Sequence, residues 1–198
     1  MAAGTEITIY LIKSIGSLVL FFIILRGVLH ASRANFYNPI TQTVLKCTNP
    51  LLSPLRGLVP TIGRIDWAVI SSAVLLQSTI LASISFISGE NWAVPGLVTL
   101  ALWGIIGVLG LLTQLYFFIL LAMIIISWVA PASSNPLIEL IWQISEPVMK
   151  PFRALVPSMG GVDFSPILLF ITIKVLQIAL HHSAVATGLP VRLLIAGL

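Results

Sequence analysis

Two arginine–aspartate pairs recur in this chain at one spacing. Arg56 precedes Asp66 by ten residues, and Arg153 precedes Asp163 by the same distance. Such a pair can close a short hairpin through an ion pair, and a guanidinium group also binds planar anions such as phosphate. The simpler interpretation is structural, a pin between a hairpin and the following helix. The alternative is a polar site for lipid phosphate or for a partner protein.

Two further polar residues lie near the middle of long apolar segments. Lys174 and Gln77 are 97 residues apart, and apolar residues surround both of them. An ionisable group inside a membrane segment costs several kcal/mol and is usually paired or functional. A structural hydrogen bond to another segment or subunit explains the two residues most simply. An intramembrane polar site on an ion or proton pathway is the alternative.

Signs of enzymatic or metal chemistry are scarce. The sequence has no phosphate-binding glycine loop, nucleotide-binding fingerprint, nucleophile elbow or zinc-protease motif. His181 and His182 are adjacent and cannot share one helical face, and His30 stands alone. The single Cys47, whose counterpart 97 residues later is Ile144, is expected to be a small buried residue. We predict no enzymatic activity, no cofactor and no metal site.

The arginine–aspartate pairs belong to a longer internal repeat. Residues 38–66 and 135–163 align without a gap at an offset of 97, with ten of 29 positions identical. The identical residues are mostly prolines, glycines and polar residues, which have backbone or charge roles. In the first copy they are Asn38, Pro39, Pro50, Pro54, Arg56, Leu58, Val59, Pro60, Gly63 and Asp66. In the second copy they are Asn135, Pro136, Pro147, Pro151, Arg153, Leu155, Val156, Pro157, Gly160 and Asp163.

Each copy predicts two short interfacial elements and a turn. An asparagine followed by a proline is typical of a helix start. We expect this helix to end near Pro50 or Pro147, and a second short amphipathic element to follow. Gly63 and Gly160 are expected in turns that need unusual backbone angles. The aspartate that closes each copy can cap the next helix.

Composition places these segments between membrane spans. Hydrophobic residues make up 58% of the chain and charged residues 8%, and the mean hydropathy is +1.10. Apolar run length predicts four spans, at about residues 7–30, 67–88, 104–130 and 164–183. Residues 97–130 are too long for one untilted span, so an early start, a tilt, a short interfacial piece or a fifth span remains open. The fold class is therefore all-α, a polytopic membrane protein with two tandem parallel units, residues 1–96 and 97–198.

Basic residues predict the orientation of the spans. Residues 31–66 carry four of them outside the spans and residues 131–163 carry two, whereas residues 89–103 carry none and Arg192 in the tail weakly opposes the pattern. The positive-inside rule then puts both repeated segments in the cytoplasm and both termini outside. We read the first apolar segment as a retained span, because it lacks a basic leader and is too long for a signal peptide.

The repeated motif resembles a known family. The pattern F-Y-N-P-x(10)-P-x(3)-P-x-R-x(3)-P-x(2)-G-x-[IV]-D, opened here by Phe36 and Tyr37, is similar to that of YggT (YlmG-like) membrane proteins of bacteria and plastids. The second copy has Ser133 and Ser134 in place of the aromatic pair. The resemblance implies a bacterial inner-membrane protein linked to osmotic tolerance, to cell division or to maturation of a membrane cytochrome complex.

Two functions are compatible with these features. The first is a non-enzymatic scaffold or assembly factor that contacts membrane lipids and another membrane protein or a second copy of itself. The second is a small oligomeric ion or solute transporter or channel in the osmotic stress response. The spread of basic residues over two segments argues against nucleic-acid binding, and no small-molecule substrate is indicated.

Overall fold

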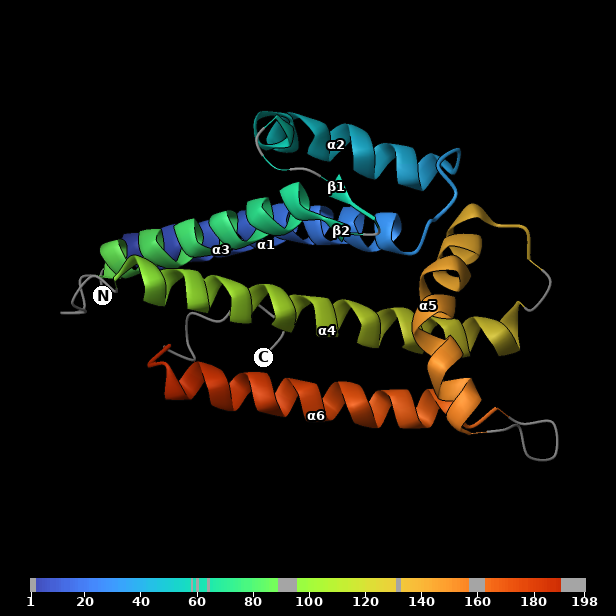
Figure 1. The fold of residues 1–198 in the computed structure, drawn as a ribbon. Helices are drawn as coiled ribbons and strands as arrows, with labels where there is room; N and C mark the ends of the chain where they lie inside the picture. Colours follow the sequence, from blue (N-terminus) through green and yellow to red (C-terminus); the bar gives the residue numbers. More distant parts are fainter. Residues whose placement is uncertain are drawn as a thin grey trace.

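The computed structural model describes residues 3–57, 59, 61–63, 65–88, 96–130, 133–156 and 163–189. These residues form six helices and one two-stranded antiparallel hairpin (Figure 1). The chain order is α1 (Ala3–Ala31), α2 (Pro39–Arg56), β1 (Thr61–Ile62), β2 (Ile65–Asp66), α3 (Trp67–Ser88), α4 (Leu97–Val129), α5 (Pro136–Leu155) and α6 (Ser165–Ala186).

Four of these helices are long and apolar enough to cross a membrane. They are α1, α3, α4 and α6, and together they confirm the predicted all-α polytopic class. The helix α4 is one continuous element of 33 residues that begins at Leu97, earlier than the predicted residue 104. At 1.5 Å per residue it is about 50 Å long, more than the roughly 30 Å of a bilayer core. The described residues therefore contain four candidate spans, and residues 97–129 are one long helix instead of two spans.

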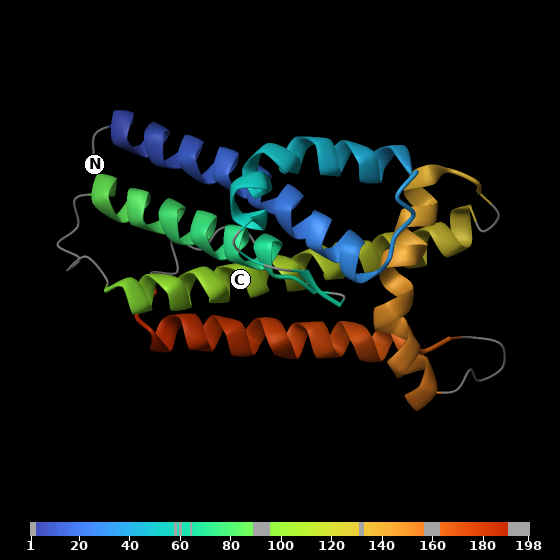
Figure 2. The same cartoon turned by 45° about the horizontal axis from the view of Figure 1, so that its top comes forward.

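The four spans pack side by side in the order α1, α3, α4 and α6 (Figures 1 and 2). Glycines let α3 and α4 approach closely. A Cβ added at Gly107 would lie 2.5 Å from Nε2 of Gln77, and one at Gly104 would lie 2.9 Å from the carbonyl oxygen of Val74. This order makes α3 and α4 the central pair and leaves α1 and α6 on the outside.

The helices α2 and α5 continue through both of their prolines, so the predicted break at Pro50 and Pro147 is wrong. A proline inside a helix removes one backbone donor and favours a bend. Figure 2 shows such a bend near the C-terminal end of α2. Pro54 has no backbone N–H and cannot donate to the carbonyl oxygen of Pro50. The hydroxyl of Ser53 donates to that oxygen instead, at 3.3 Å. The predicted second element is therefore the last turns of the same helix.

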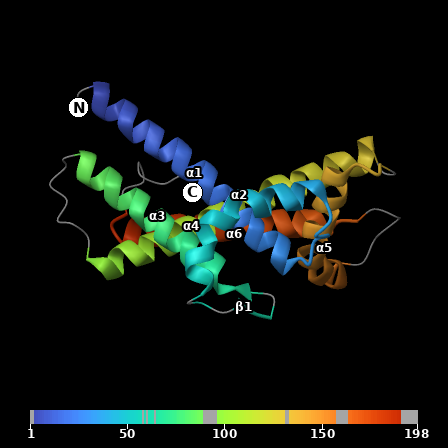
Figure 3. The ribbon, with the colours of Figure 1, turned by 90° about the horizontal axis from the view of Figure 1, so that it is seen from above.

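The two corresponding helices lie differently against the spans. Figures 1 and 2 show α5 crossing α4 and α6, as expected for a helix in the membrane interface. Seen from above in Figure 3, α2 instead runs in the general direction of α4 and α6 and crosses α1 obliquely. Two hydrogen bonds of 2.8 Å join the copies: the side-chain amide of Asn38 donates to the carbonyl oxygen of Pro136, and the backbone of Asn35 donates to Oε1 of Gln143.

Candidate functional site

Asparagine caps begin both amphipathic helices, as the sequence predicts. Oδ1 of Asn38 accepts from the backbone N–H of Ile40, and Oδ1 of Asn135 accepts from that of Leu137, each at 2.9 Å. Proline occupies the first helical position in both copies, where its missing N–H costs no hydrogen bond. Asn38 is buried and also bonds to the second copy, whereas Asn135 is exposed.

The ion pair of the first copy closes the β hairpin against α2. Nη2 of Arg56 lies 2.9 Å from Oδ2 of Asp66, whose side chain is 3% exposed. The other oxygen of Asp66 accepts from the backbone N–H of Val69 at 3.3 Å and so caps α3. Gly63 in the hairpin has φ 63°, the left-handed region that favours glycine. One carboxylate thus fixes a helix start and a guanidinium group together.

The second copy has the same pair in a more open setting. Nε of Arg153 lies 3.1 Å from Asp163, whose side chain is 40% exposed, and Nη1 lies 2.7 Å from Glu146. Asp163 also accepts from the backbone N–H of Ser165 at 2.9 Å. Pro157 and Gly160, like Pro60 of the first copy, lie outside the described residues.

The pKa values of this second pair follow its contacts. Partial burial raises the pKa of Asp163, but hydrogen bonds from Ser165 and the charge of Arg153 outweigh it and hold that pKa below its ordinary value. For Arg153 the effects have the opposite sign. Burial lowers its pKa, but the contacts with Glu146 and Asp163 outweigh burial and raise the pKa above its ordinary value. The pair is therefore ionised throughout the physiological range.

Arg26 of α1 is a site residue that sequence reasoning missed. It is 3% exposed and donates to Thr48 at 2.7 Å, to Asn49 at 2.8 Å and to the carbonyl oxygen of Leu45 at 3.4 Å, all on α2. The available signal was an arginine inside a predicted span. Its counterpart at the offset of 97 is Met123, so this link between span and amphipathic helix belongs to the first copy alone.

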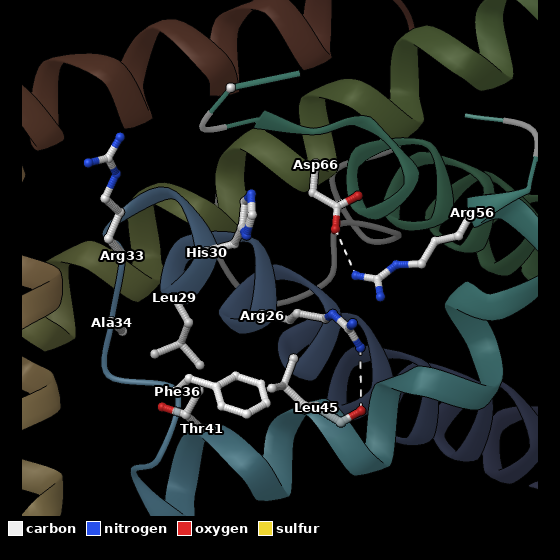
Figure 4. A pocket seen from close by; sticks show the side chains of 11 residues that line it. Arg26, Leu29, His30, Arg33, Ala34, Phe36, Thr41, Leu45, Arg56 and Asp66 are labelled. Carbon is white, nitrogen blue, oxygen red and sulfur yellow. Dashed lines mark hydrogen bonds and ion pairs between the residues drawn. The ribbon is translucent and has the colours of Figure 1, made fainter. Parts of the chain in front are cut away.

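A cavity of about 320 Å³ opens where α1, α2 and the hairpin meet (Figure 4). We call it the cationic cavity. Figure 4 shows Arg26, Arg56 and Asp66 close together, with Arg33 extending from the end of α1. The polar residues that line it are Arg26, His30, Arg33, Thr41, Arg56 and Asp66, and the remaining lining residues are apolar or glycine. His30, expected to stand alone, is therefore part of a polar cluster.

The two intramembrane polar residues do not share a site within this chain. Gln77 is 1% exposed between α3 and α4, and its amide has no hydrogen-bond partner among the described residues. Lys174 lies on an exposed part of α6, with Nζ 5.0 Å from the ring centre of Phe117 on α4. They thus face different surroundings.

Two further sequence predictions concern Cys47 and metal ligands. Cys47 is exposed, contrary to expectation, because α2 buries the face of Val44 and Thr48 whereas α5 buries the face that includes Ile144. Among the described residues, no three histidine, cysteine, aspartate or glutamate side chains gather as metal ligands.

These features define a multi-pass α-helical membrane protein with two copies of a capped, ion-paired segment between its spans. The family described as CCB3/YggT matches residues 5–85 and again residues 102–184, with starts 97 residues apart. The chain belongs to this family. The prediction made from the motif is thereby confirmed.

Bacterial relatives cover nearly the whole chain. An uncharacterized protein of Pseudomonas aeruginosa is 41% identical over 187 residues, 93% of this chain and 94% of its own length. The uncharacterized protein YggT of Escherichia coli is 34% identical over 179 residues, 90% of this chain and 92% of its own. A Vibrio alginolyticus relative is 33% identical over 83% of this chain and 88% of its own. No solved structure shows a significant match.

Proposed function

We propose that this protein is a non-enzymatic scaffold or assembly factor of the bacterial cytoplasmic membrane. It would hold another membrane protein through α6 and face the cytoplasm with its two repeated segments. The observation that carries the proposal is the exposed position of Lys174 within a candidate span. The links of the family to osmotic tolerance, cell division and membrane-complex maturation fit such a role.

Lys174 supports a partner because of its depth. It lies nine residues after the start of α6, about 14 Å along the helix axis, too far for its side chain to reach either end easily. Ile171 and Ile178, on the same face, are exposed as well. The contact with Phe117 offsets only part of the cost of an ammonium group in hydrocarbon. A carboxylate or other acceptor on a partner helix would offset the rest.

The alternative function is an oligomeric ion or solute transporter or channel in the osmotic stress response. Its supporting observation is the unpartnered amide of Gln77 inside the protein. Because Gln77 and Lys174 face different surroundings, a conduction path that used both residues would have to involve contacts between subunits. That requirement makes the alternative the second choice.

The test is affinity purification of the tagged protein from native membranes in mild detergent, followed by mass spectrometry and a particle mass. We expect a partner in fixed ratio with the wild type and with Lys174→Arg, and its loss with Lys174→Met. Val175→Ala, beside Lys174 on α6, should retain it. A wild type that runs as a bare monomer would refute the proposal. A homo-oligomer without another protein, together with Lys174-dependent ion flux in liposomes, would favour the alternative.

A further inference from the structure

We infer that the cationic cavity binds a phosphate group, either on a lipid headgroup or as a free phosphate or phosphate ester. This inference goes beyond the proposed scaffold role and does not depend on it. It rests on the charge of the described lining, on two buried polar side chains, on the backbone of one arginine, and on the absence of matching residues from the second copy.

The described lining of the cavity has an excess of positive charge. Arg26, Arg33 and Arg56 line the cavity together with one carboxylate, Asp66, so these four residues carry two net positive charges. Figure 4 shows Arg26 and Arg56 beside Asp66 and Arg33 farther along the lining. Asp66 is already committed, because it pairs with Arg56 and caps α3. A dianionic phosphate would balance the excess, and guanidinium groups match its oxygen geometry.

Two buried polar side chains of the cavity indicate a ligand directly. Arg26 is almost fully buried, yet the three acceptors of its hydrogen bonds are all neutral. The charge of Asp66 also acts on Arg26, but Arg56 opposes it and already pairs with Asp66. A buried cation whose hydrogen-bond acceptors are all neutral is costly. Thr41 is 4% exposed, and its hydroxyl has no hydrogen-bond partner among the described residues. A phosphate-bearing ligand in the cavity could offer an acceptor to either group.

Arg33 is held in a conformation that its side chain does not favour. It lies two residues after the end of α1 with φ 53°, and the backbone N–H of Ala34 donates to the carbonyl oxygen of Leu29 at 3.0 Å. Glycine is the usual residue at such a helix end. An arginine there costs backbone energy but adds a positively charged residue to the cavity lining.

The second copy lacks these features. At the offset of 97, Arg26, His30, Arg33 and Thr41 correspond to Met123, Ser127, Ala130 and Ile138. Only the shared pair, Arg56 with Asp66 and Arg153 with Asp163, is retained. The extra positive groups are therefore not needed to form an amphipathic helix between two spans.

The position of the cationic cavity is compatible with a lipid headgroup and with a soluble phosphate. Asp66 also borders an apolar cavity of about 220 Å³ between α1, α3 and α4, which has room for part of an acyl chain. A soluble phosphate would reach the cationic cavity without using this apolar space. The shared chemistry is the phosphate group, and the experiment separates the sources.

The experiment uses the full chain purified in a neutral detergent. Inorganic phosphate and glycerol 3-phosphate are titrated by calorimetry, while phosphatidic acid and diacylglycerol, which differ by the phosphate, are compared by native mass spectrometry. The variants are Arg33→Gly, which suits the backbone angle and removes the charge, Arg26→Met, which copies the second repeat, and Thr41→Val. Lys46→Gln is the matched control, an exposed charge on α2 outside the cavity.

We expect a phosphate-bearing probe to bind the wild type, and Arg33→Gly and Arg26→Met to weaken binding about tenfold or more. Thr41→Val should weaken it a few-fold, and Lys46→Gln should leave it unchanged. Binding of phosphatidic acid alone identifies a lipid headgroup, and binding of the soluble probes identifies a free ligand; both support the inference. The inference is overturned if no phosphate probe binds, or if Lys46→Gln weakens binding as much as Arg33→Gly.

Arg33→Gly keeps the test decisive if Arg26→Met fails to fold. Glycine at this helix end should not lower stability, so loss of binding in that variant is not loss of structure. The readout is also separate from the partner test, which uses Lys174 on another helix. A protein can therefore bind phosphate and lack a partner, or hold a partner and bind no phosphate.

Discussion

The two copies of the repeated segment share a motif but differ in what surrounds it. In the first copy, α2 runs in the general direction of α4 and α6, is linked to α1 by Arg26, and buries Asp66. In the second copy, α5 crosses the spans, and Asp163 lies near the surface with a second carboxylate, Glu146, beside its arginine. The shared residues thus set the helix caps and the ion pairs, whereas the differing ones set polarity and burial.

The largest expected difference between the copies concerns the aspartates. We expect Asp66→Asn to lower the free energy of unfolding by about 2 to 3 kcal/mol, because it removes a charged hydrogen bond at a buried position. Asp163→Asn should cost less than about 1 kcal/mol, since its pair is exposed and screened. Unfolding by detergent titration measures both. Equal costs would mean that burial does not distinguish the pairs.

A second prediction concerns the contact between the two halves at α3 and α4. We expect Gly107→Ala to destabilise the protein by about 1 to 3 kcal/mol, because the added methyl meets the amide of Gln77. Gly4→Ala in α1 is the control, since a Cβ there meets no neighbour within 4 Å, and it should be neutral or slightly stabilising. Thermal unfolding in detergent compares them, and a neutral Gly107→Ala would contradict this packing.

The helix caps offer a smaller contrast. Asn38→Ala should cost about 1 to 2 kcal/mol, because it removes a cap and the bond to the carbonyl oxygen of Pro136. Asn135→Ala removes a cap alone and should cost about 0.5 to 1 kcal/mol. The ratio of the two costs, measured by the same titration, tests whether the bond between the copies contributes. Identical costs would show that it does not.

The smallest expected effect is the response of the second pair to acid. Because the pKa of Asp163 is lowered in the folded protein, its contribution to stability is fully present above the ordinary carboxyl pKa of about 4 and is lost as pH falls through the folded value. The difference between wild type and Asp163→Asn should be constant from pH 7 to about pH 5 and should vanish in stronger acid. If the stability difference between wild type and Asp163→Asn increased as the pH falls, the prediction would be wrong.

Local features were largely predictable from the sequence. The Asn-Pro helix starts, the capping role of the aspartates, the turn glycine Gly63 and both ion pairs depend on residues close in the chain. The four spans follow from apolar run length. The helix ends at Pro50 and Pro147 were predicted wrongly because packing against α1, α3, α4 and α6 holds both helices together through their prolines. The division into residues 1–96 and 97–198, the orientation and the partner remain predictions.

By itself, the sequence determined the class, the family, the repeat and the local capping chemistry, because run length, composition and short spacings encode each of them. Only the tertiary structure decided that Arg26 joins Arg33, Arg56 and His30 around one cavity, that Cys47 is exposed, and that Gln77 and Lys174 face different surroundings. The physical reason is that these outcomes depend on which face of a helix each neighbour covers. Two copies of one motif can therefore share a helix cap and an ion pair and still differ in what surrounds them.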